Sequence, residues 1–358
     1  MNKLYSSYRF LFVAWLYLFT IGTLFAQSNA YFTLLNQDNG LRSGDVMCFE
    51  QDDNGFMWIG TKYGLNVYDG KRFNIYALNN AEIPYNSDIS CLKKNNSKMW
   101  IGTLGDGLYR YNIKNKSTQK VELLPEGDQE YNIYCIELWK NILYVGTDVG
   151  LYRIDSVDQV TNVNLDALNP NITALEVFDH NLLIGTTNNG LFRHDIKSNS
   201  TGKIADSEQI SALQSLNEKQ FLIGTKSDGL LHAEFNDTSF SILNLSNLLC
   251  ERNPIVNTIL LDNKQSIWVG TDGDGLCQLK INNGEIKKAF HYRHSDKNRN
   301  TIASNAIFSL YEDDENKIWI GTIWKGLNIL NQNQTSSAFY FSDYYGINPY
   351  PVLSISKI

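Results

Sequence analysis

The segment Met57-Trp58-Ile59-Gly60-Thr61 decides the fold, because close copies of it recur along most of the chain. The later copies are MWIGT, LYVGT, LLIGT, FLIGT, IWVGT and IWIGT, at 99–103, 143–147, 182–186, 221–225, 267–271 and 318–322. Successive glycines lie 42, 44, 39, 39, 46 and 51 residues apart, and a Gly-Leu pair begins four or five residues after each one. Seven copies in one register identify a long structural repeat.

Each unit contains the signals of four short strands, named A to D. An apolar run such as 46–49 forms strand A, a polar turn such as 52–55 follows, and the repeated segment forms strand B. The Gly-Leu pair opens strand C, as at 107–111, and a looser β-rich run such as 73–76 forms strand D. No segment after the N-terminus keeps a long apolar stripe at helical spacing. Period and strand count predict an all-β protein, a seven-bladed β-propeller of four-stranded antiparallel blades.

The N-terminus has the pattern of a secretory signal peptide. Lys3 and Arg9 precede an apolar run at 10–25, and the small residue Ala26 follows it. The run is shorter than the ~20 residues that usually span a bilayer, which favours cleavage over a retained anchor. No cysteine that could carry a lipid lies near its end. We therefore expect residues 1–26 to direct export and to be removed.

The charge of the chain limits its partners. Its 358 residues include 31 Lys and Arg against 38 Asp and Glu, a formal charge of −7. Removal of the signal segment takes two cations and no anions, which leaves −9 (29 − 38). Such a protein lacks the broad basic surface that phosphate backbones require, so we expect no nucleic-acid partner.

The cysteines and tryptophans of the repeat are interpreted as packing residues. One strand-A position always holds a small or short side chain: Cys48, Cys91, Cys135, Ala174, Ala212, Thr258 and Ser309. This pattern predicts free, buried cysteines near the central axis rather than disulfides. One strand-B position holds Trp58, Trp100, Tyr144, Leu183, Leu222, Trp268 and Trp319. A position that accepts leucine is expected to pack between blades.

Sequence motifs of catalysis and metal binding are not found. No histidine pair has zinc-ligand spacing, and no GxSxG, Walker A or GxGxxG segment lies in a matching strand–helix context. Asp272 and Asp274 flank a turn glycine and are expected to be solvated, with a calcium role left open. We therefore expect no cofactor, no metal and no catalytic residue.

The unit at 52–65 closely resembles the two-component regulator propeller repeat, and the segment 39–46 resembles the opening of that repeat. Units one, two, six and seven match best. The resemblance implies the periplasmic sensor region of hybrid two-component histidine kinases, in which two propellers commonly precede a β-sandwich, a membrane helix and kinase domains. It also implies glycan fragments as the class of ligand. This sequence departs from that layout, because it has no membrane helix after the signal segment and no kinase motifs.

Three functions remain open at this stage. The first is a periplasmic ligand-sensing propeller, the N-terminal part of a sensor. The second is a stand-alone exported propeller that binds a protein or a carbohydrate. The third is an enzyme such as a propeller lyase or glycosidase, because a fold does not fix a function. The apolar, small side chains expected at the axis argue against the third.

A ligand site is expected on the face formed by the B–C and D–A connections. The B–C turn of unit seven carries an unusual tryptophan, and a large exposed aromatic side chain marks a recognition surface. Nearby cations would suit a carboxylated or sulfated oligosaccharide. The candidate residues are Trp324, Lys325, Arg293, His294, Arg299, Tyr63 and Arg42. The alternatives are a solvated loop, or an aromatic residue that a second propeller or a homodimer partner covers.

The sequence contains one predicted strand D more than a ring of seven blades needs. Residues 337–341 are expected to form another strand D and 352–355 another strand A, while 31–35 already supplies a strand D before unit one. We expect 31–35 to complete blade seven, which gives a propeller over 31–337. Residues 338–358 would then form strands D and A of an incomplete following blade, and the chain would be a truncated sensor.

Overall fold

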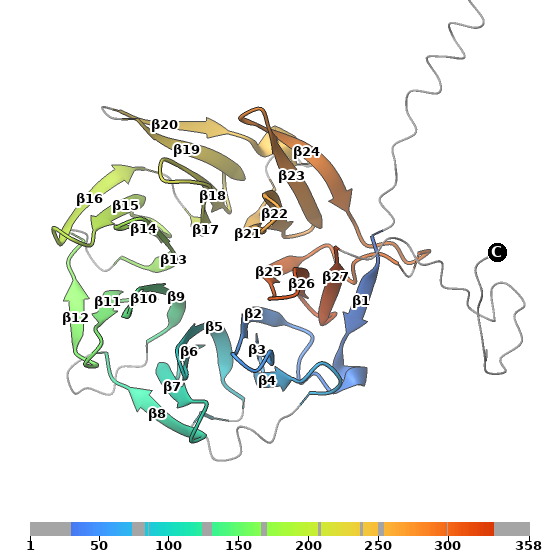
Figure 1. The fold of residues 1–358 in the computed structure, drawn as a ribbon. Coiled ribbons are helices and arrows are strands. Elements are labelled where there is room, and N and C mark those ends of the chain that lie inside the picture. Colours follow the sequence, from blue (N-terminus) through green and yellow to red (C-terminus); the bar gives the residue numbers. More distant parts are fainter. Residues whose placement is uncertain are drawn as a thin grey trace, which may run out of the picture. The chain divides into compact units, whose positions relative to one another are not determined.

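Seven antiparallel sheets surround a central axis in the computed structural model (Figure 1). The structure describes residues 30–73, 83–84, 86–123, 131–165, 170–206, 209–236, 239–249, 254–298 and 300–332. These residues fall within one compact unit, Ala30–Gln334. The predicted all-β, seven-bladed propeller is confirmed. Within the described part of the chain, no helix has the length and apolar character needed to span a membrane.

The blades follow one another along the chain, and each runs from an inner to an outer strand. Blades one to three are β2 (Val46–Gln51), β3 (Met57–Thr61), β4 (Gly64–Tyr68); β5 (Asp88–Asn95), β6 (Lys98–Leu104), β7 (Leu108–Asn112), β8 (Ser117–Val121); and β9 (Ile133–Trp139), β10 (Ile142–Thr147), β11 (Gly150–Ile154), β12 (Val160–Val163). Blades four and five are β13 (Ile172–Phe178), β14 (Asn181–Thr186), β15 (Leu191–Asp195), β16 (Ser200–Ala205); and β17 (Ile210–Ser215), β18 (Gln220–Thr225), β19 (Leu230–Asn236), β20 (Ser239–Asn244). Blades six and seven are β21 (Val256–Leu261), β22 (Ser266–Thr271), β23 (Leu276–Asn282), β24 (Glu285–Tyr292); and β25 (Ile307–Glu312), β26 (Lys317–Thr322), β27 (Leu327–Asn331), β1 (Phe32–Leu35). Two short 3-10 helices, η2 (Gln37–Asn39) and η4 (Ser246–Leu248), lie in connections.

The N-terminal strand closes the ring. β1 pairs antiparallel with β27, with Phe32 opposite Leu330 and Leu35 opposite Leu327, so the first strand completes the last blade. The expected use of 31–35 as the outer strand of blade seven is therefore confirmed. In blade one, three strands and a Tyr68–Phe73 bridge are described. The rest of its expected strand D, the signal segment 1–26 and the tail 338–358 lie outside the described residues.

Close packing at the axis explains the repeated glycine and the small side chain beside it. In blade one, a Cβ added to Gly60 would lie 2.3 Å from the Cys48 Sγ atom and 2.7 Å from the Ile89 Cγ2 atom of blade two. In blade two, a Cβ on Gly102 would lie 2.4 Å from the Cys91 Sγ atom. Four of the five cysteines are described, and all four are free thiols, as predicted. Cys277 is buried, but Cys48, Cys91 and Cys135 are half-buried, so the expectation of fully buried cysteines at the axis is wrong.

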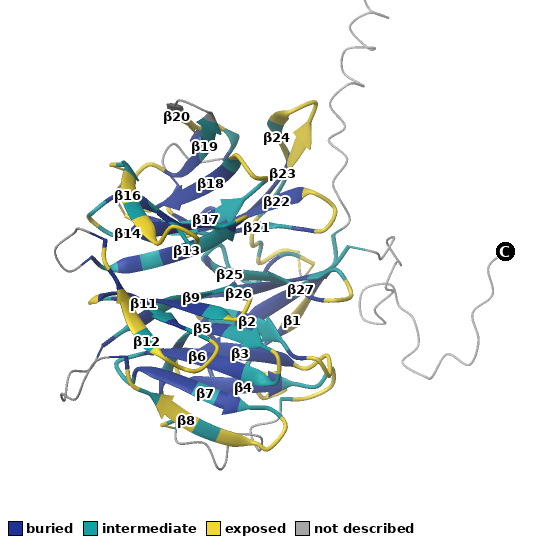
Figure 2. Ribbon diagram, turned by 60° about the vertical axis from the view of Figure 1, so that its left-hand side comes forward, coloured by how far each residue is buried: buried dark blue, intermediate teal, exposed yellow. Residues whose placement is uncertain are grey.

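The core lies between neighbouring blades. Side chains at the strand-B aromatic position are all buried, from Leu183 and Leu222 at 0% exposure to Trp319 at 5%. Trp58 of blade one, for example, packs against Tyr109 and Tyr111 of blade two. Figure 2 shows that middle strands such as β3, β14 and β22 are buried, that inner strands such as β2 and β17 are half-buried, and that outer strands such as β8, β12 and β16 are largely exposed.

Candidate functional site

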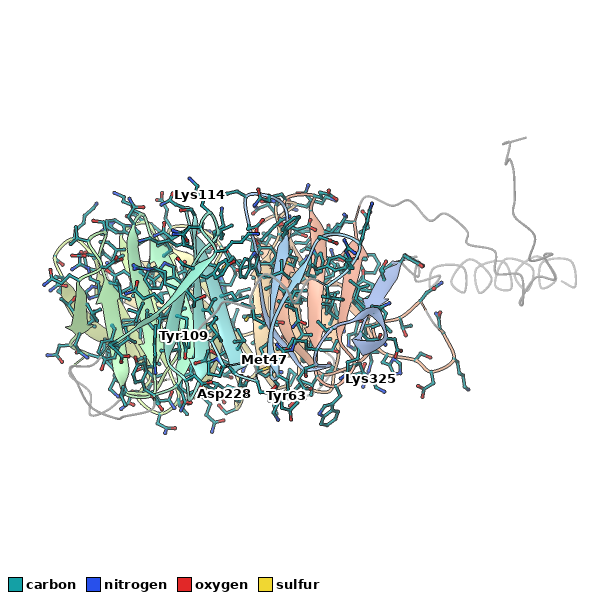
Figure 3. All side chains as sticks on the ribbon, turned by 90° about the horizontal axis from the view of Figure 1, so that it is seen from below. Met47, Tyr63, Tyr109, Lys114, Asp228 and Lys325 are labelled. Carbon is teal, nitrogen blue, oxygen red and sulfur yellow. The ribbon has the colours of Figure 1, made fainter. Side chains whose placement is uncertain are left out.

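The B–C turns gather on one face of the ring. Figure 3 shows Tyr63, Asp228 and Lys325, from the B–C turns of blades one, five and seven, along one face, and Lys114 on the opposite face. We use the name closure surface for the part of this face where the ring closes. It comprises the B–C turns 272–275, 323–326 and 62–64 and the connecting segments 293–298, 300–306 and 42–45. All of the described candidate residues belong to it.

Trp324 is held outward at the centre of the closure surface. Its side chain is 78% exposed, and its backbone has φ +71°, a conformation that a bulky residue adopts only when its surroundings impose it. The backbone N–H of Trp324 donates to the Asp45 Oδ1 atom at 2.7 Å, and the Asp45 carbonyl accepts from Lys62 N–H at 3.1 Å. The Gly326 N–H donates to the Gly44 carbonyl at 2.9 Å. Blade one therefore fixes the turn of blade seven.

Tyr63 presents a second exposed aromatic ring across the closure. It is 53% exposed, and the Lys62 ammonium lies 6.0 Å from its ring centroid. Lys325 is also exposed. The structure thus places two exposed aromatic residues and two exposed lysines on the adjoining turns of blades one and seven. The backbone of each of these two turns is hydrogen-bonded to Asp45.

Arg293 and His294 lie beside blade six and have acidic neighbours. The Arg293 Nη1 atom lies 3.4 Å from the Asp274 Oδ1 atom, and the His294 Nε2 atom lies 3.0 Å from the Asp296 Oδ1 atom. His294 also bonds the Ile302 carbonyl through Nδ1 at 2.8 Å. These contacts orient Arg293 toward the B–C turn of blade six and His294 toward its own connection, so both side chains already have partners within the protein.

The two remaining candidates are placed differently. Arg42 is half-buried, and its backbone N–H donates to the Asn66 Oδ1 atom at 3.1 Å. Arg299 lies outside the described residues. The cationic character that the structure brings next to Trp324 therefore comes from Lys62 and Lys325, and Lys62 was not among the predicted residues.

Asp274, Cys277 and His291 form the one group of possible metal ligands found among the described residues. Their ligand atoms lie within 4.8 Å of one another, and Asp274 is only 1% exposed. The expectation of a solvated Asp274 is therefore wrong, because the connection after β24 covers this turn. The Arg293 guanidinium already lies 3.4 Å from the Asp274 carboxylate, so it would compete with a metal ion for this group. The His291 Nε2 atom also lies 2.5 Å from the Asp274 carbonyl, so we interpret the group as a bonded network that fixes the turn.

Three positioning residues were missed from the sequence. Asp45 bonds both exposed turns, and nothing in its local pattern distinguishes it from other turn aspartates. Asn66 and Asn328 are 0% and 1% exposed, and their Oδ1 atoms accept from Arg42 N–H and Ala303 N–H at 3.1 and 2.8 Å. Each holds the segment that precedes strand A. The sequence signal that could have identified these two asparagines is Gly-Leu-Asn, which occurs only in units one and seven.

The family model described as two component regulator propeller matches residues 40–63 and 301–324. Each match begins in the segment that the buried asparagine holds and ends at an exposed aromatic residue, Tyr63 or Trp324. The two exposed aromatics thus occupy the same position of the repeat.

Similar proteins share parts of the sequence or the fold. A histidine kinase of Formosa agariphila is 42% identical over 52 residues, which are 14% of this chain and 4% of that protein. Two extracellular domains assigned to hybrid two component systems of B. thetaiotaomicron are each 24% identical, with TM-scores of 0.70 and 0.69. They match 84% and 86% of this chain, which spans 42% and 40% of theirs. Virginiamycin B lyase from Staphylococcus aureus shares the fold at 14% identity and a TM-score of 0.63, over 84% of this chain and 98% of that one. The chain is therefore a seven-bladed propeller that carries the two component regulator propeller repeat.

Proposed function

We propose that this chain is an exported, periplasmic ligand-sensing propeller, the sensor part of a hybrid two-component regulator, and that it is not an enzyme. The observation that carries the proposal is the pair of exposed aromatic residues, Trp324 and Tyr63, at equivalent positions on two turns that Asp45 ties together. Backbone hydrogen bonds already fix the conformation of this surface. Such a surface favours binding, because little conformational entropy is lost when a ligand binds.

The chemistry of the closure surface supports an acidic oligosaccharide as the ligand. Trp324 and Tyr63 offer apolar rings to the C–H faces of sugars, and Lys62 and Lys325 offer ammonium groups to carboxylates or sulfates. The formal charge of the whole chain is −7, so a cationic group on this face distinguishes it from the rest of the surface. Glycan fragments are also the ligand class that the resemblance to the sensor family implies.

Calorimetric titration tests this proposal. A short oligogalacturonide is titrated against the wild-type chain and the Trp324→Ala and Lys325→Ala variants, with a neutral galacto-oligosaccharide as a second probe. We expect Trp324→Ala to weaken binding of the acidic probe at least about tenfold, the effect typical of a central aromatic anchor. Val157→Ala is the matched control, because Val157 is also 78% exposed and lies in the C–D turn of blade three. Unchanged binding in both turn variants, or no binding to wild type, would show that the proposed site is wrong.

A protein partner is the second candidate for the same surface. The observation that favours it is the exposure of two large aromatic side chains together, because stable partners commonly cover such residues. The partner would be a second propeller or a second copy of this chain. Sedimentation of wild type and Trp324→Ala over a range of concentrations distinguishes the cases, since only a covered surface would make the association depend on Trp324.

A further inference from the structure

A cavity of about 260 Å³ opens between blades two and three, on the face opposite the closure surface. Its floor is apolar and contains Trp100, Leu143 and Ile154. Its rim is polar and comes from three turns: 95–98 between β5 and β6, Asn141 between β9 and β10, and 155–158 between β11 and β12. An apolar floor with a few convergent polar groups is the usual form of a small-molecule site.

The floor contains a buried hydrogen-bond donor that is not used. Trp100 is 3% exposed, and its indole Nε1 atom has no hydrogen-bond partner among the described residues. Buried polar atoms of this kind are rare in folded proteins, because an unmade hydrogen bond costs free energy. The equivalent tryptophans, Trp58, Trp268 and Trp319, each donate to an aspartate of the turn between strands A and B, at 3.0, 2.8 and 2.8 Å.

The difference arises from the residues of that turn. In blade one, Gln51 pairs with Met57 and five residues lie between them, among them the acceptor Asp52. The equivalent pair in blade two is Lys94 and Met99, with four residues between them, and Asn95 stands in place of the aspartate. The shorter turn of blade two lines the cavity together with Trp100.

The charges around the cavity are balanced. The Asp158 carboxylate binds the Arg110 guanidinium at 2.5 Å and the Lys98 ammonium at 3.6 Å. Desolvation opposes ionisation of Asp158, but the hydrogen bond and charge of Arg110, aided by Lys98, hold its pKa below the ordinary value. Arg110 also covers one face of the Trp100 ring, with 5.6 Å between its Cζ atom and the ring centroid. Because each cation is already paired and that ring face is occupied, the cavity offers hydrogen bonds rather than net charge or a stacking platform.

We propose that this cavity binds a small, uncharged, hydroxyl-rich molecule of the size of one hexose, with a ligand oxygen accepting the Trp100 indole N–H. The rim amides, Ser97 and Ser156 would bond the remaining hydroxyls, and Leu143 and Ile154 would contact the apolar face of the ring. The volume lies just below the ~300–1,000 Å³ of typical ligand pockets, which limits the occupant to a single small unit. This site is independent of the closure surface and of the acidic ligand proposed there.

Nuclear magnetic resonance of the tryptophan side chains tests the proposal directly. The ¹⁵N-labelled full chain is titrated with glucose, galactose and mannose, one at a time, with glycerol as the control for a general polyol effect. We expect the Trp100 indole N–H signal, assigned from the Trp100→Phe variant, to shift and saturate with one of these hexoses and not with glycerol. The signals of Trp58, Trp268 and Trp319 serve as internal controls, because their N–H groups are already bonded to aspartates.

Affinity measurements on variants complete the test. Trp100→Phe keeps an aromatic side chain but removes the N–H, and we expect hexose binding at least about tenfold weaker, equivalent to about 1.4 kcal/mol. Asn141→Ala, on the exposed rim, is the second variant and is expected to weaken binding without affecting folding. Trp324→Ala should leave hexose binding unchanged. The proposal is overturned if no hexose gives a saturable shift, if glycerol gives the same shift, or if both rim and floor variants bind like wild type.

Discussion

Blades one and two pack alike at the central axis, but they differ in the turn that connects strands A and B. Both place a cysteine against the repeated glycine, with Cys48 beside Gly60 and Cys91 beside Gly102. Both bury a tryptophan at the same position of strand B. In blade one the indole N–H is bonded to a turn aspartate, whereas in blade two it has no partner among the described residues.

This comparison shows which parts of a blade must stay constant for the ring to form and which parts can change. The repeated glycine of the inner edge does not vary, because each blade meets its neighbour there at distances that leave no room for an added Cβ. The turns can vary, because they face solvent at the rim and only need to connect two strands. A turn without the aspartate leaves a buried donor unbonded beside a cavity, so a new binding site can arise without any change to the packing of the ring.

Removal of the turn aspartate should have the largest effect. Asp52 is 3% exposed and accepts from Asn54 N–H, Phe56 N–H and the Trp58 indole N–H, at 2.9, 3.1 and 3.0 Å. Asp52→Ala leaves these three donors without their acceptor, and we expect a loss of about 3–5 kcal/mol in the free energy of unfolding. Urea denaturation measures it. The neighbouring Asp53→Ala is the control, because Asp53 has a 71% exposed side chain, and equal losses would contradict the role of Asp52.

Replacement of the two tryptophans sharpens the comparison. Trp58→Phe and Trp100→Phe remove similar volumes from equivalent positions, but only Trp58 loses a hydrogen bond to a carboxylate. We expect Trp58→Phe to cost about 1.5–3 kcal/mol more than Trp100→Phe in the free energy of unfolding. Equal costs in urea denaturation would mean that the bond between Trp58 and Asp52 adds nothing to stability.

Alanine at the repeated glycine tests the shared inner edge. A Cβ at Gly102 would lie 2.4 Å from the Cys91 Sγ atom and 2.6 Å from the Ile133 Cγ2 atom, so Gly102→Ala should cost about 1–3 kcal/mol through overpacking. Gly60→Ala should cost a similar amount, because the contacts in blade one are as close. Gly202 on the outer strand β16 is the control, since nothing lies within 4 Å of its Cβ position. Thermal denaturation should show Gly202→Ala unchanged or slightly stabilised, and a drop as large as that of Gly102→Ala would contradict this account.

The smallest effect is expected from pH, through a position that holds Glu50 in blade one and Lys93 in blade two. Desolvation raises the pKa of Glu50 from 4.5 to about 7, against the opposing charge of Lys93. The folded chain therefore keeps a proton on Glu50 that the unfolded chain releases between pH 4.5 and 7. The stability contributed by this group is fully present below about pH 4.5 and falls as the pH rises to about 7.

Glu50→Gln should flatten this dependence, because the amide stays uncharged and its oxygen can still accept from Lys94 N–H. We expect the free energy of unfolding of the variant to change less with pH between 4.5 and 7 than that of the wild type. Urea denaturation at several pH values measures the difference, and Glu122→Gln, an exposed carboxylate of blade two, is the control. A wild-type slope that survives in Glu50→Gln would assign the pH dependence to other groups.

Much of the candidate site could be predicted, and the parts that could not depend on contacts between blades. Trp324 was found because a tryptophan in a B–C turn stands out from the other copies of the repeat, and Tyr63 because ring closure sets unit one beside unit seven. Arg293 and His294 were interpreted as free cations, since the sequence does not show that Asp274 and Asp296 lie beside them. Asp274 was expected in solvent for the same reason, although a connection from its own blade buries it.

The sequence by itself determined the number of blades, the order of their strands and the small residues at the axis. These features follow from side-chain size and strand periodicity within one unit, and seven copies repeat the signal. Only the tertiary structure decided which turns adjoin and which donors are bonded. Asp45 bonds Trp324 across 279 residues of chain, and the Trp100 indole N–H has no acceptor among the described residues. The physical reason is that a hydrogen bond or a cavity depends on atoms that folding brings together from separate parts of the chain. A repeat can be recognised from the order of the residues alone.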